Sequence, residues 1–182
     1  SLDVTVKNEH PVDVLARLSA VVTDGAGRQL ARLTALPQPV PNDGEALFAL
    51  MIGVRGVLPW SLSAPNLYNV RLALELDGRV ADAREVRVGF RKIEARDGRL
   101  WLNDQPLYLT GFNRHEDSPR SNMCPDLETT RRDLEAMREA GANFVRLCHY
   151  PHHPAELDLC DELGLLAMGE IPLYWWDGLN EG

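Results

Sequence analysis

The stretch from Asn143 to Met168 reads NFVRLCHYPHHP, then AELDLCDELG, then LLAM, and it decides how the second half of the chain folds. Its opening residues are mostly apolar and favour a short buried strand. Pro154 suits the first turn of a helix, where its missing N–H costs nothing, and Gly164 suits the left-handed position at the helix end. The predicted apolar side of this helix consists of Leu157, Cys160 and Leu163. Apolar residues follow Gly164 directly, so the stretch predicts a parallel strand–helix–strand unit.

The same alternation of strand and helix begins earlier, just after Arg91. A small hairpin is predicted around the turn at Asp97-Gly98. A helix is predicted to begin after Asp126, which suits an N-cap, and to stop at Gly141. The predicted parallel strands lie at about 107–111, 143–147 and 165–170, and the two helices between them at about 127–140 and 154–163.

Residues 1–90 show a different pattern, in which apolar and polar residues alternate with a period of two. The longest run is Val12–Val22, where every second residue is apolar. Asp24-Gly25 and Asp77-Gly78 are turn signals between such runs, and Pro37–Pro41 indicates an irregular link or a solvent edge. Short alternating strands joined by turns predict an antiparallel β-sandwich.

Polar side chains gather at the predicted carboxyl ends of the parallel strands, which is where α/β folds carry out chemistry. Arg146 and His149 lie at and just after one predicted strand, and His115 follows the preceding one. We therefore expect these three side chains to converge on one face. Glu116 and Glu170 also follow predicted strands and could be imagined as an acid and a nucleophile. The preferred interpretation is that both are rim carboxylates that hold nearby arginines.

Several stretches, in the same order along the chain, resemble motifs of glycoside hydrolase family 2, which comprises β-galactosidases, β-glucuronidases and β-mannosidases. The family signature is matched at Asn143, Arg146, His149, Tyr150, Pro151, Asp161 and Gly164. Gly111–Asp117 resembles the loop after the family's first barrel strand, and Val88–Ile93 resembles the junction into the barrel. Trp60 with Asn66–Tyr68 resembles a late strand of the preceding sandwich domain. The match departs at Leu147, where the family favours a small residue.

The resemblance implies a multidomain chain of β and α/β class. An immunoglobulin-like β-sandwich over 1–90 would be followed, over 91–182, by the first three βα units of a (β/α)8 TIM barrel. The implied activity is that of a retaining, exo-acting β-glycosidase, which hydrolyses β-galactosides, β-glucuronides or β-mannosides. The family takes its acid/base and its nucleophile from the fourth and seventh barrel strands, outside this chain. We therefore expect no catalytic residue here and no hydrolysis by this chain alone. Glu181 follows an asparagine, as the family acid does, but comes too soon after the third strand.

The resemblance also implies roles for four residues. His115 and His149 would bind sugar hydroxyls, for which neutral imidazole offers one donor and one acceptor. Asn113 would help to shape the same pocket, and Arg146 would hold the nucleophile ionised and aimed. The aromatic residues of the tail, Tyr174, Trp175 and Trp176, would either stack on sugar faces or pack against further barrel segments, and both alternatives stay open.

The composition of the chain argues against two classes of binding partner, nucleic acids and membranes. The chain has 182 residues, 45% hydrophobic and 25% charged, with a net charge of −8, which is globular and argues against nucleic acid. No apolar run is long enough to cross a membrane, so no membrane partner is expected. No signal peptide is visible, which leaves the compartment open, with the cytoplasm as the expectation.

We expect no metal and no other cofactor. Prolines interrupt His149, His152 and His153, so these histidines do not share a helix face. Three cysteines, Cys124, Cys148 and Cys160, have no metal-binding spacing and are interpreted as free thiols.

Two alternatives to a glycosidase remain at this point. One is a non-catalytic carbohydrate-binding or interaction module built on the sandwich, and the other is a different α/β enzyme that shares the strand–helix–strand unit by chance. The loop over 113–117 argues against a plain binding sandwich, which has no use for it. The third parallel strand would leave an open edge, covered by the tail over 174–182 or by another copy of the chain in a homo-oligomer. The sugar cannot be deduced from these residues.

Overall fold

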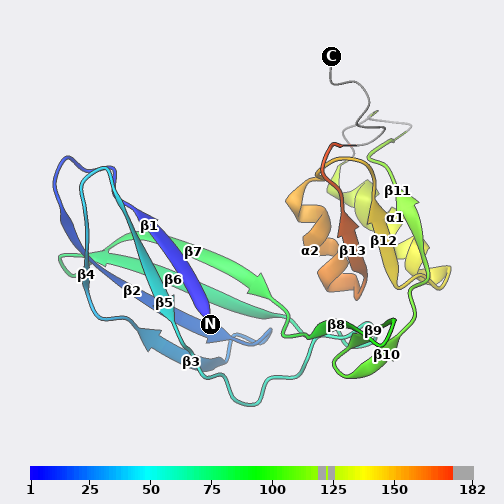
Figure 1. Ribbon diagram of the computed structural model, residues 1–182, viewed down its shortest axis with the longest axis horizontal. Coiled ribbons are helices and arrows are strands. Elements are labelled where there is room, and N and C mark those ends of the chain that lie inside the picture. The colour runs from blue at the N-terminus through cyan, green and yellow to red at the C-terminus, as the bar shows by residue number, and fades with distance from the viewer. Residues whose placement is uncertain (119–121, 123–125, 174–182) are drawn as a thin grey trace. The chain divides into compact units, whose positions relative to one another are not determined.

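The computed structural model describes residues 1–118, 122 and 126–173 (Figure 1). The chain divides into two compact units, one made of Ser1–Leu58 with Asn66–Phe90 and the other of Pro59–Pro65 with Arg91–Gly182. Several residues that the sequence singled out lie outside the described part of the chain: Cys124, Tyr174, Trp175, Trp176, Asn180 and Glu181.

The first unit is the predicted antiparallel sandwich of two sheets. The smaller sheet pairs β1 (Leu2–Lys7) with β5 (Glu45–Leu50). The larger sheet has the order β3-β2-β6-β7, with the short strand β4 paired to β2. Its strands are β2 (Val14–Thr23), β3 (Gln29–Thr34), β4 (Gln38–Val40), β6 (Tyr68–Leu76) and β7 (Arg79–Val88).

The alternation in β2 places one face of the strand in the core of the sandwich. Ala16, Leu18, Ala20 and Val22 are all at most 2% exposed, and Phe48 packs in the same cluster from the opposite sheet. The apolar face predicted for this strand is therefore confirmed, except at its first member.

Val12 is 62% exposed and precedes β2. The side chain of Asn8 donates a hydrogen bond to the carbonyl of Val12 at 2.9 Å and another to that of Val40 at 3.1 Å. These bonds hold Val12 in a turn, because Asn side chains satisfy backbone carbonyls where no ladder does.

The second unit begins with a three-stranded antiparallel meander. The predicted hairpin is observed as β8 (Ile93–Arg96) and β9 (Arg99–Leu102), and β10 (Gln105–Leu107) adds to β9. Asp97 and Gly98, with φ of 53° and 68°, form the tight turn between β8 and β9.

The strand predicted at 107–111 is wrong, because two strands share this region. The antiparallel β10 ends at Leu107, and the parallel strand β11 is Gly111–Arg114. A Cβ atom at Gly111 would lie 2.0 Å from the carbonyl oxygen of Phe144, so only glycine permits the two backbones to approach this closely. The stretch Gly111–Asp117, expected to be a loop, therefore begins as the strand itself.

Three parallel strands form the sheet that carries the polar residues. The order is β11-β12-β13, with β12 at Phe144–Leu147 and β13 at Leu166–Gly169, close to the predicted 143–147 and 165–170. Helices α1 (Leu127–Glu139) and α2 (Pro154–Leu163) connect them (Figure 1). As predicted, Asp126 caps α1 by accepting from the amide of Thr129, and Gly164 ends α2 with φ of 70°. Among the described residues, no helix is long and apolar enough to span a bilayer.

The apolar side predicted for helix α2 is confirmed at Cys160 and Leu163, which pack in the core, and is wrong at Leu157. Leu157 is 46% exposed, whereas Glu156, Leu159 and Cys160 are buried. The helix is rotated so that the carboxylate of Glu156 reaches the buried guanidinium of Arg114.

Trp60 belongs to the second unit and not to a sandwich strand, which corrects the placement that the resemblance implied. It forms only an isolated bridge with Pro65, and β6 begins later. Trp60 is fully buried, its Nε1 donates to the carbonyl of Asp161 at 2.8 Å, and the guanidinium of Arg91 lies 5.0 Å from its ring. These partners explain why the indole leaves the alternating sheet pattern.

Candidate functional site

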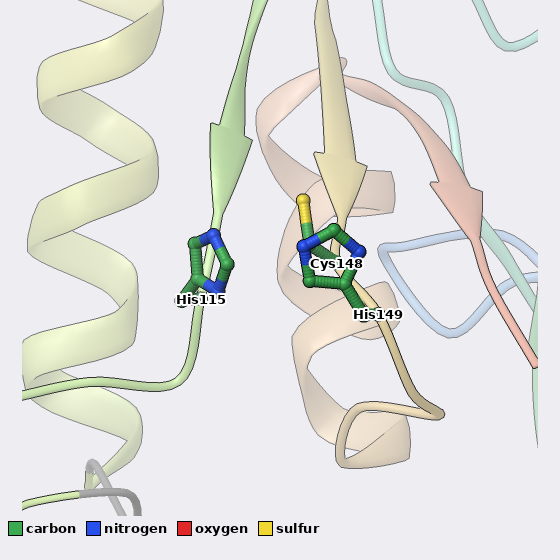
Figure 2. Close-up of side chains that lie close together, drawn as sticks. All are labelled: His115, Cys148 and His149. Carbon is green, nitrogen blue, oxygen red and sulfur yellow. The ribbon is translucent and has the colours of Figure 1, made fainter. Parts of the chain in front are cut away.

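The parallel sheet brings the predicted site residues together at its carboxyl end. Asn113 and Arg146 are direct register partners on β11 and β12. His115 follows β11 directly, and His149 comes two residues after the end of β12. Figure 2 shows His115 at the tip of β11 and, beside it, Cys148 and His149 at the tip of β12. The topology therefore places all four predicted residues at the carboxyl end of the sheet.

The two histidines lie side by side. The centroids of the His115 and His149 rings are 5.2 Å apart, and the rings meet edge to face at 65°. His115 is exposed, whereas the side chain of His149 is 33% exposed. Two imidazoles at this spacing present hydrogen-bonding groups to the same small volume, which suits a polyhydroxylated ligand.

Glu170, directly after β13, contacts both Arg146 on β12 and His149 in the loop after β12. Its Oε1 accepts from Nε of Arg146 at 2.6 Å, and its Oε2 lies 3.2 Å from Nδ1 of His149. Both oxygens of Glu170 are therefore engaged in orienting neighbours. This geometry is that of a carboxylate that aims other side chains.

Arg146 is held on three sides. Besides the bond to Glu170, its Nη1 lies 3.4 Å from Oδ1 of Asn113 and 3.5 Å from Sγ of Cys148. Its side chain is 33% exposed, so one face of the guanidinium remains open to solvent at the strand ends. A guanidinium fixed in this way can orient a carboxylate or a ligand oxygen.

Glu116 lies in the loop after β11 and binds the loop after β12. Its backbone N–H donates to the hydroxyl of Tyr150 at 3.4 Å, and its Oε1 accepts from the backbone N–H of His153 at 3.4 Å. These bonds connect the loop that carries His115 to the loop that carries His149. Glu116 thus has the geometry of a structural rim residue.

A buried ionic network lies beneath these loops. Arg114, 2% exposed in its side chain, pairs with Glu156 at 3.0 Å and with Asp133 at 3.2 Å. Nδ1 of His152 is 3.0 Å from the other oxygen of Glu156, and its Nε2 is 2.7 Å from the carbonyl of Cys148. Because a carbonyl only accepts, Nε2 of His152 carries a proton and donates it. The network therefore fixes the backbone immediately before His149.

Burial also raises the pKa of the Cys160 thiol, which lies one turn after Glu156 on α2. Desolvation, with a smaller contribution from the carboxylate of Glu156, raises the pKa of Cys160 to about 12 from 9.0. This thiol is 2% exposed, so it stays protonated and unreactive in the folded chain. It does not take part in the site.

Two clusters in the described residues bring possible metal-ligating atoms within 4.8 Å of one another. The first consists of His115, Cys148 and His149, and the second of Glu116, His152 and Glu156. In the second cluster Glu156 is already paired with Arg114 at 3.0 Å, so a metal ion would lie next to a fixed cation. The first cluster is the one in which a metal ion would be favoured.

Sequence reasoning missed Cys148, Glu156 and Asp133 as members of this region, and it placed Arg114 beside the rim carboxylates, whereas Arg114 pairs with Glu156 and Asp133. Arg114 looks like a loop residue by sequence, and Glu156 looks like an exposed residue in the first turn of a helix. The only signal available was a charged residue next to the histidine motif, which does not distinguish a buried ion pair from a solvated one. Contacts between the ends of separate strands decide such cases.

Two family models match nearly the whole chain. The model described as "Glycosyl hydrolases family 2" matches residues 1–91, and that described as "Glycosyl hydrolases family 2, TIM barrel domain" matches residues 93–177. A beta-galactosidase of Pectobacterium atrosepticum is 44% identical over 112 residues, which are 61% of this chain and 11% of that protein. Another, of Enterobacter cloacae, is 34% identical over 165 residues, 90% of this chain and 15% of its own length.

Solved structures have the same fold. The crystal structure of Bacteroides uniformis beta-glucuronidase superimposes with a TM-score of 0.84 at 30% identity and covers 94% of this chain and 21% of that chain. The chain thus spans only 11% and 15% of the length of the two curated relatives.

Proposed function

Because this chain belongs to glycoside hydrolase family 2, we propose that it forms part of a retaining, exo-acting β-glycosidase. In this proposal the sandwich is immunoglobulin-like, and β11, β12 and β13 with α1 and α2 are the first three βα units of a (β/α)8 barrel. The enzyme would hydrolyse the O-glycosidic bond of a β-galactoside, β-glucuronide or β-mannoside. Relatives named beta-galactosidase and a structure named beta-glucuronidase support the first two classes equally.

The observation that carries this proposal is the cluster of His115, His149, Arg146 and Asn113 at the carboxyl end of parallel strands. The two imidazoles would bind hydroxyl groups of the sugar in the terminal subsite. Asn113 would shape the wall beside them, and Arg146 would aim the carboxylate nucleophile. Fixed hydrogen-bonding groups of this kind stabilise the charge that develops on the sugar ring in the transition state.

We propose further that neither Glu116 nor Glu170 is the acid or the nucleophile. A retaining glycosidase needs two carboxyl groups about 5–5.5 Å apart that are free to act on the substrate. Here both oxygens of Glu170 orient Arg146 and His149, and the carboxylate of Glu116 accepts from the backbone N–H of His153. The chain by itself would therefore hydrolyse no glycoside, because the catalytic groups act as a unit.

Strand β13 lies at an edge of the parallel sheet, and this position supports the proposal that a further strand pairs with it. Among the described residues, β13 is hydrogen-bonded only to β12. Exposed apolar residues, Met168, Ile171 and Leu173, lie on and after this strand. We propose that another strand covers this edge, either from the same reading frame or from a second copy of the chain, since an unpaired edge invites association.

The test is to express the full reading frame that encodes this chain and to assay it with nitrophenyl β-galactoside, β-glucuronide and β-mannoside. The variants His115→Gln and His149→Gln are expected to lower kcat/KM by about 100-fold on the preferred substrate, as loss of a transition-state donor does. His10→Gln, an exposed histidine of the sandwich, is the matched control and should change nothing.

No hydrolysis of any of the three glycosides by the full product would contradict the proposal and favour a binding module. The present chain is assayed beside it and is expected to show no turnover. Turnover by the present chain that disappears in Glu116→Gln or Glu170→Gln would show that the carboxylates are misassigned.

A further inference from the structure

We infer that His115, Cys148 and His149 form a binding site for a thiophilic divalent cation, with Zn²⁺ as the preferred ion. The family resemblance assigns the two histidines to sugar and assigns nothing to the cysteine. The structure brings a ring nitrogen of each histidine and the sulfur of Cys148 within 4.8 Å of one another (Figure 2). Two imidazoles and a thiolate are a ligand set that favours Zn²⁺ over Mg²⁺ or Ca²⁺.

The geometry needs only small adjustments. Zn–N and Zn–S bonds of about 2.1 and 2.3 Å in a tetrahedron place the ligand atoms about 3.5 Å apart. The present separations, at most 4.8 Å, are therefore closed by side-chain shifts of about 1 Å. Three protein ligands leave the fourth tetrahedral position for water or a ligand oxygen. The thiol proton of Cys148 is released to solvent when the sulfur binds, because the thiolate is the ligand.

Glu170 supports this arrangement from behind. Its Oε2 is 3.2 Å from Nδ1 of His149, so Nδ1–H donates to the carboxylate and the lone pair lies on Nε2. In zinc sites a carboxylate commonly accepts from the histidine ring nitrogen that does not bind the metal, and this bond fixes the orientation of the ring.

The charges around the sulfur do not prevent binding. A cation contacts this sulfur: Nη1 of Arg146 lies 3.5 Å from Sγ of Cys148. Arg146 is already neutralised by Glu170, which accepts from its Nε at 2.6 Å. Cys148 itself is fully buried and His115 is exposed, so an entering ion meets His115 first and is then transferred to the sulfur.

The site has a functional consequence, which rests on the proposed function. The two histidines that would bind the sugar are the two that would bind the metal ion. Zn²⁺ and sugar would then exclude each other, and micromolar zinc would act as a competitive inhibitor of the glycosidase. Oxidation or alkylation of other thiols would not relieve this inhibition.

The experiment is a titration of the purified chain with Co²⁺, which reports its ligands through its absorption spectrum. A Cys124→Ser background removes one of the three thiols. We expect one equivalent of Co²⁺ to give tetrahedral d–d bands and a sulfur-to-cobalt charge-transfer band, and Zn²⁺ to displace it. Cys148→Ala should abolish the charge-transfer band. His115→Gln, at an exposed position, should weaken Co²⁺ binding at least about tenfold, since even the loss of a residue that hydrogen-bonds a metal ligand costs that much.

The matched controls are Cys160→Ala, the other buried thiol, and His10→Gln, and both should leave the titration unchanged. Circular dichroism of each variant verifies that it is folded. A charge-transfer band that survives in Cys148→Ala, or a spectrum of octahedral cobalt without sulfur in the parent chain, would overturn the inference. The spectrum involves no sugar, so its outcome is independent of whether the reading frame encodes a glycosidase.

Discussion

Breaking the buried pair of Arg114 and Glu156 should destabilise the second unit more than any surface charge change. The two side chains are 2% and 3% exposed, and Nη1 of Arg114 lies 3.0 Å from Oε1 of Glu156. In Glu156→Met the guanidinium keeps one carboxylate partner, Asp133, which is 44% exposed, besides its neutral partners Thr130 Oγ1 and the carbonyl of His115, and Nδ1 of His152 loses its partner. Removal of one partner of a buried ion pair costs about 3–5 kcal/mol, because the other charge stays buried.

The magnitude is large compared with the stability of one domain, which is about 5–15 kcal/mol. Arg114→Met should cost a similar amount, since it leaves the Glu156 carboxylate without its cation. The double variant should cost about 2 kcal/mol less than the sum of the two single variants, because no isolated charge of the pair then remains buried.

Urea unfolding followed by tryptophan fluorescence measures this in the whole chain. Both tryptophans of the described residues, Trp60 and Trp101, belong to the second unit, so their fluorescence reports on that unit. The control is Glu128→Gln, which removes an exposed partner of Arg132 at 3.7 Å and should leave the midpoint unchanged. If the two single variants add to the double variant, or if Glu156→Met unfolds at the parent midpoint, the pair is not the buried ionic contact described here.

Two further changes test the packing of the same unit. Gly111→Ala should separate β11 from β12 and lower the free energy of unfolding by about 3 kcal/mol, because its Cβ atom would lie 2.0 Å from the carbonyl oxygen of Phe144. Gly169→Ala, whose Cβ atom would have nothing within 4 Å, should be tolerated. A Gly111→Ala chain with the parent urea midpoint would contradict the close approach of the two backbones. Burial raises the pKa of Cys160 to about 12, so the unfolded chain ionises first, near pH 9, and stability that is fully present below pH 9 should be lost as the pH rises toward 12. Cys160→Ala should lose less stability over that range, and equal losses measured by urea unfolding at pH 8 and 11 would refute the assignment.

The local elements were readable from the sequence because their signals lie within a few residues. Pro154 and Gly164 define both ends of α2, and the observed helix Pro154–Leu163 has the predicted bounds. Asp126 caps α1 as expected, since its carboxylate needs only the amide of Thr129 three residues away. The sandwich pattern and the β8–β9 hairpin follow from alternation and from a glycine that adopts a positive φ.

Tertiary structure alone decided where charges and thiols lie. The start of β11 at Gly111 depends on the carbonyl of Phe144, which is 33 residues away in the chain, and no local pattern encodes that distance. The buried Glu156 of α2 has a cation partner because Arg114 reaches it from the end of β11. The proximity of Cys148 to His115 likewise arises from pairing between β11 and β12, since parallel register aligns the ends of strands that are separated by a whole helix.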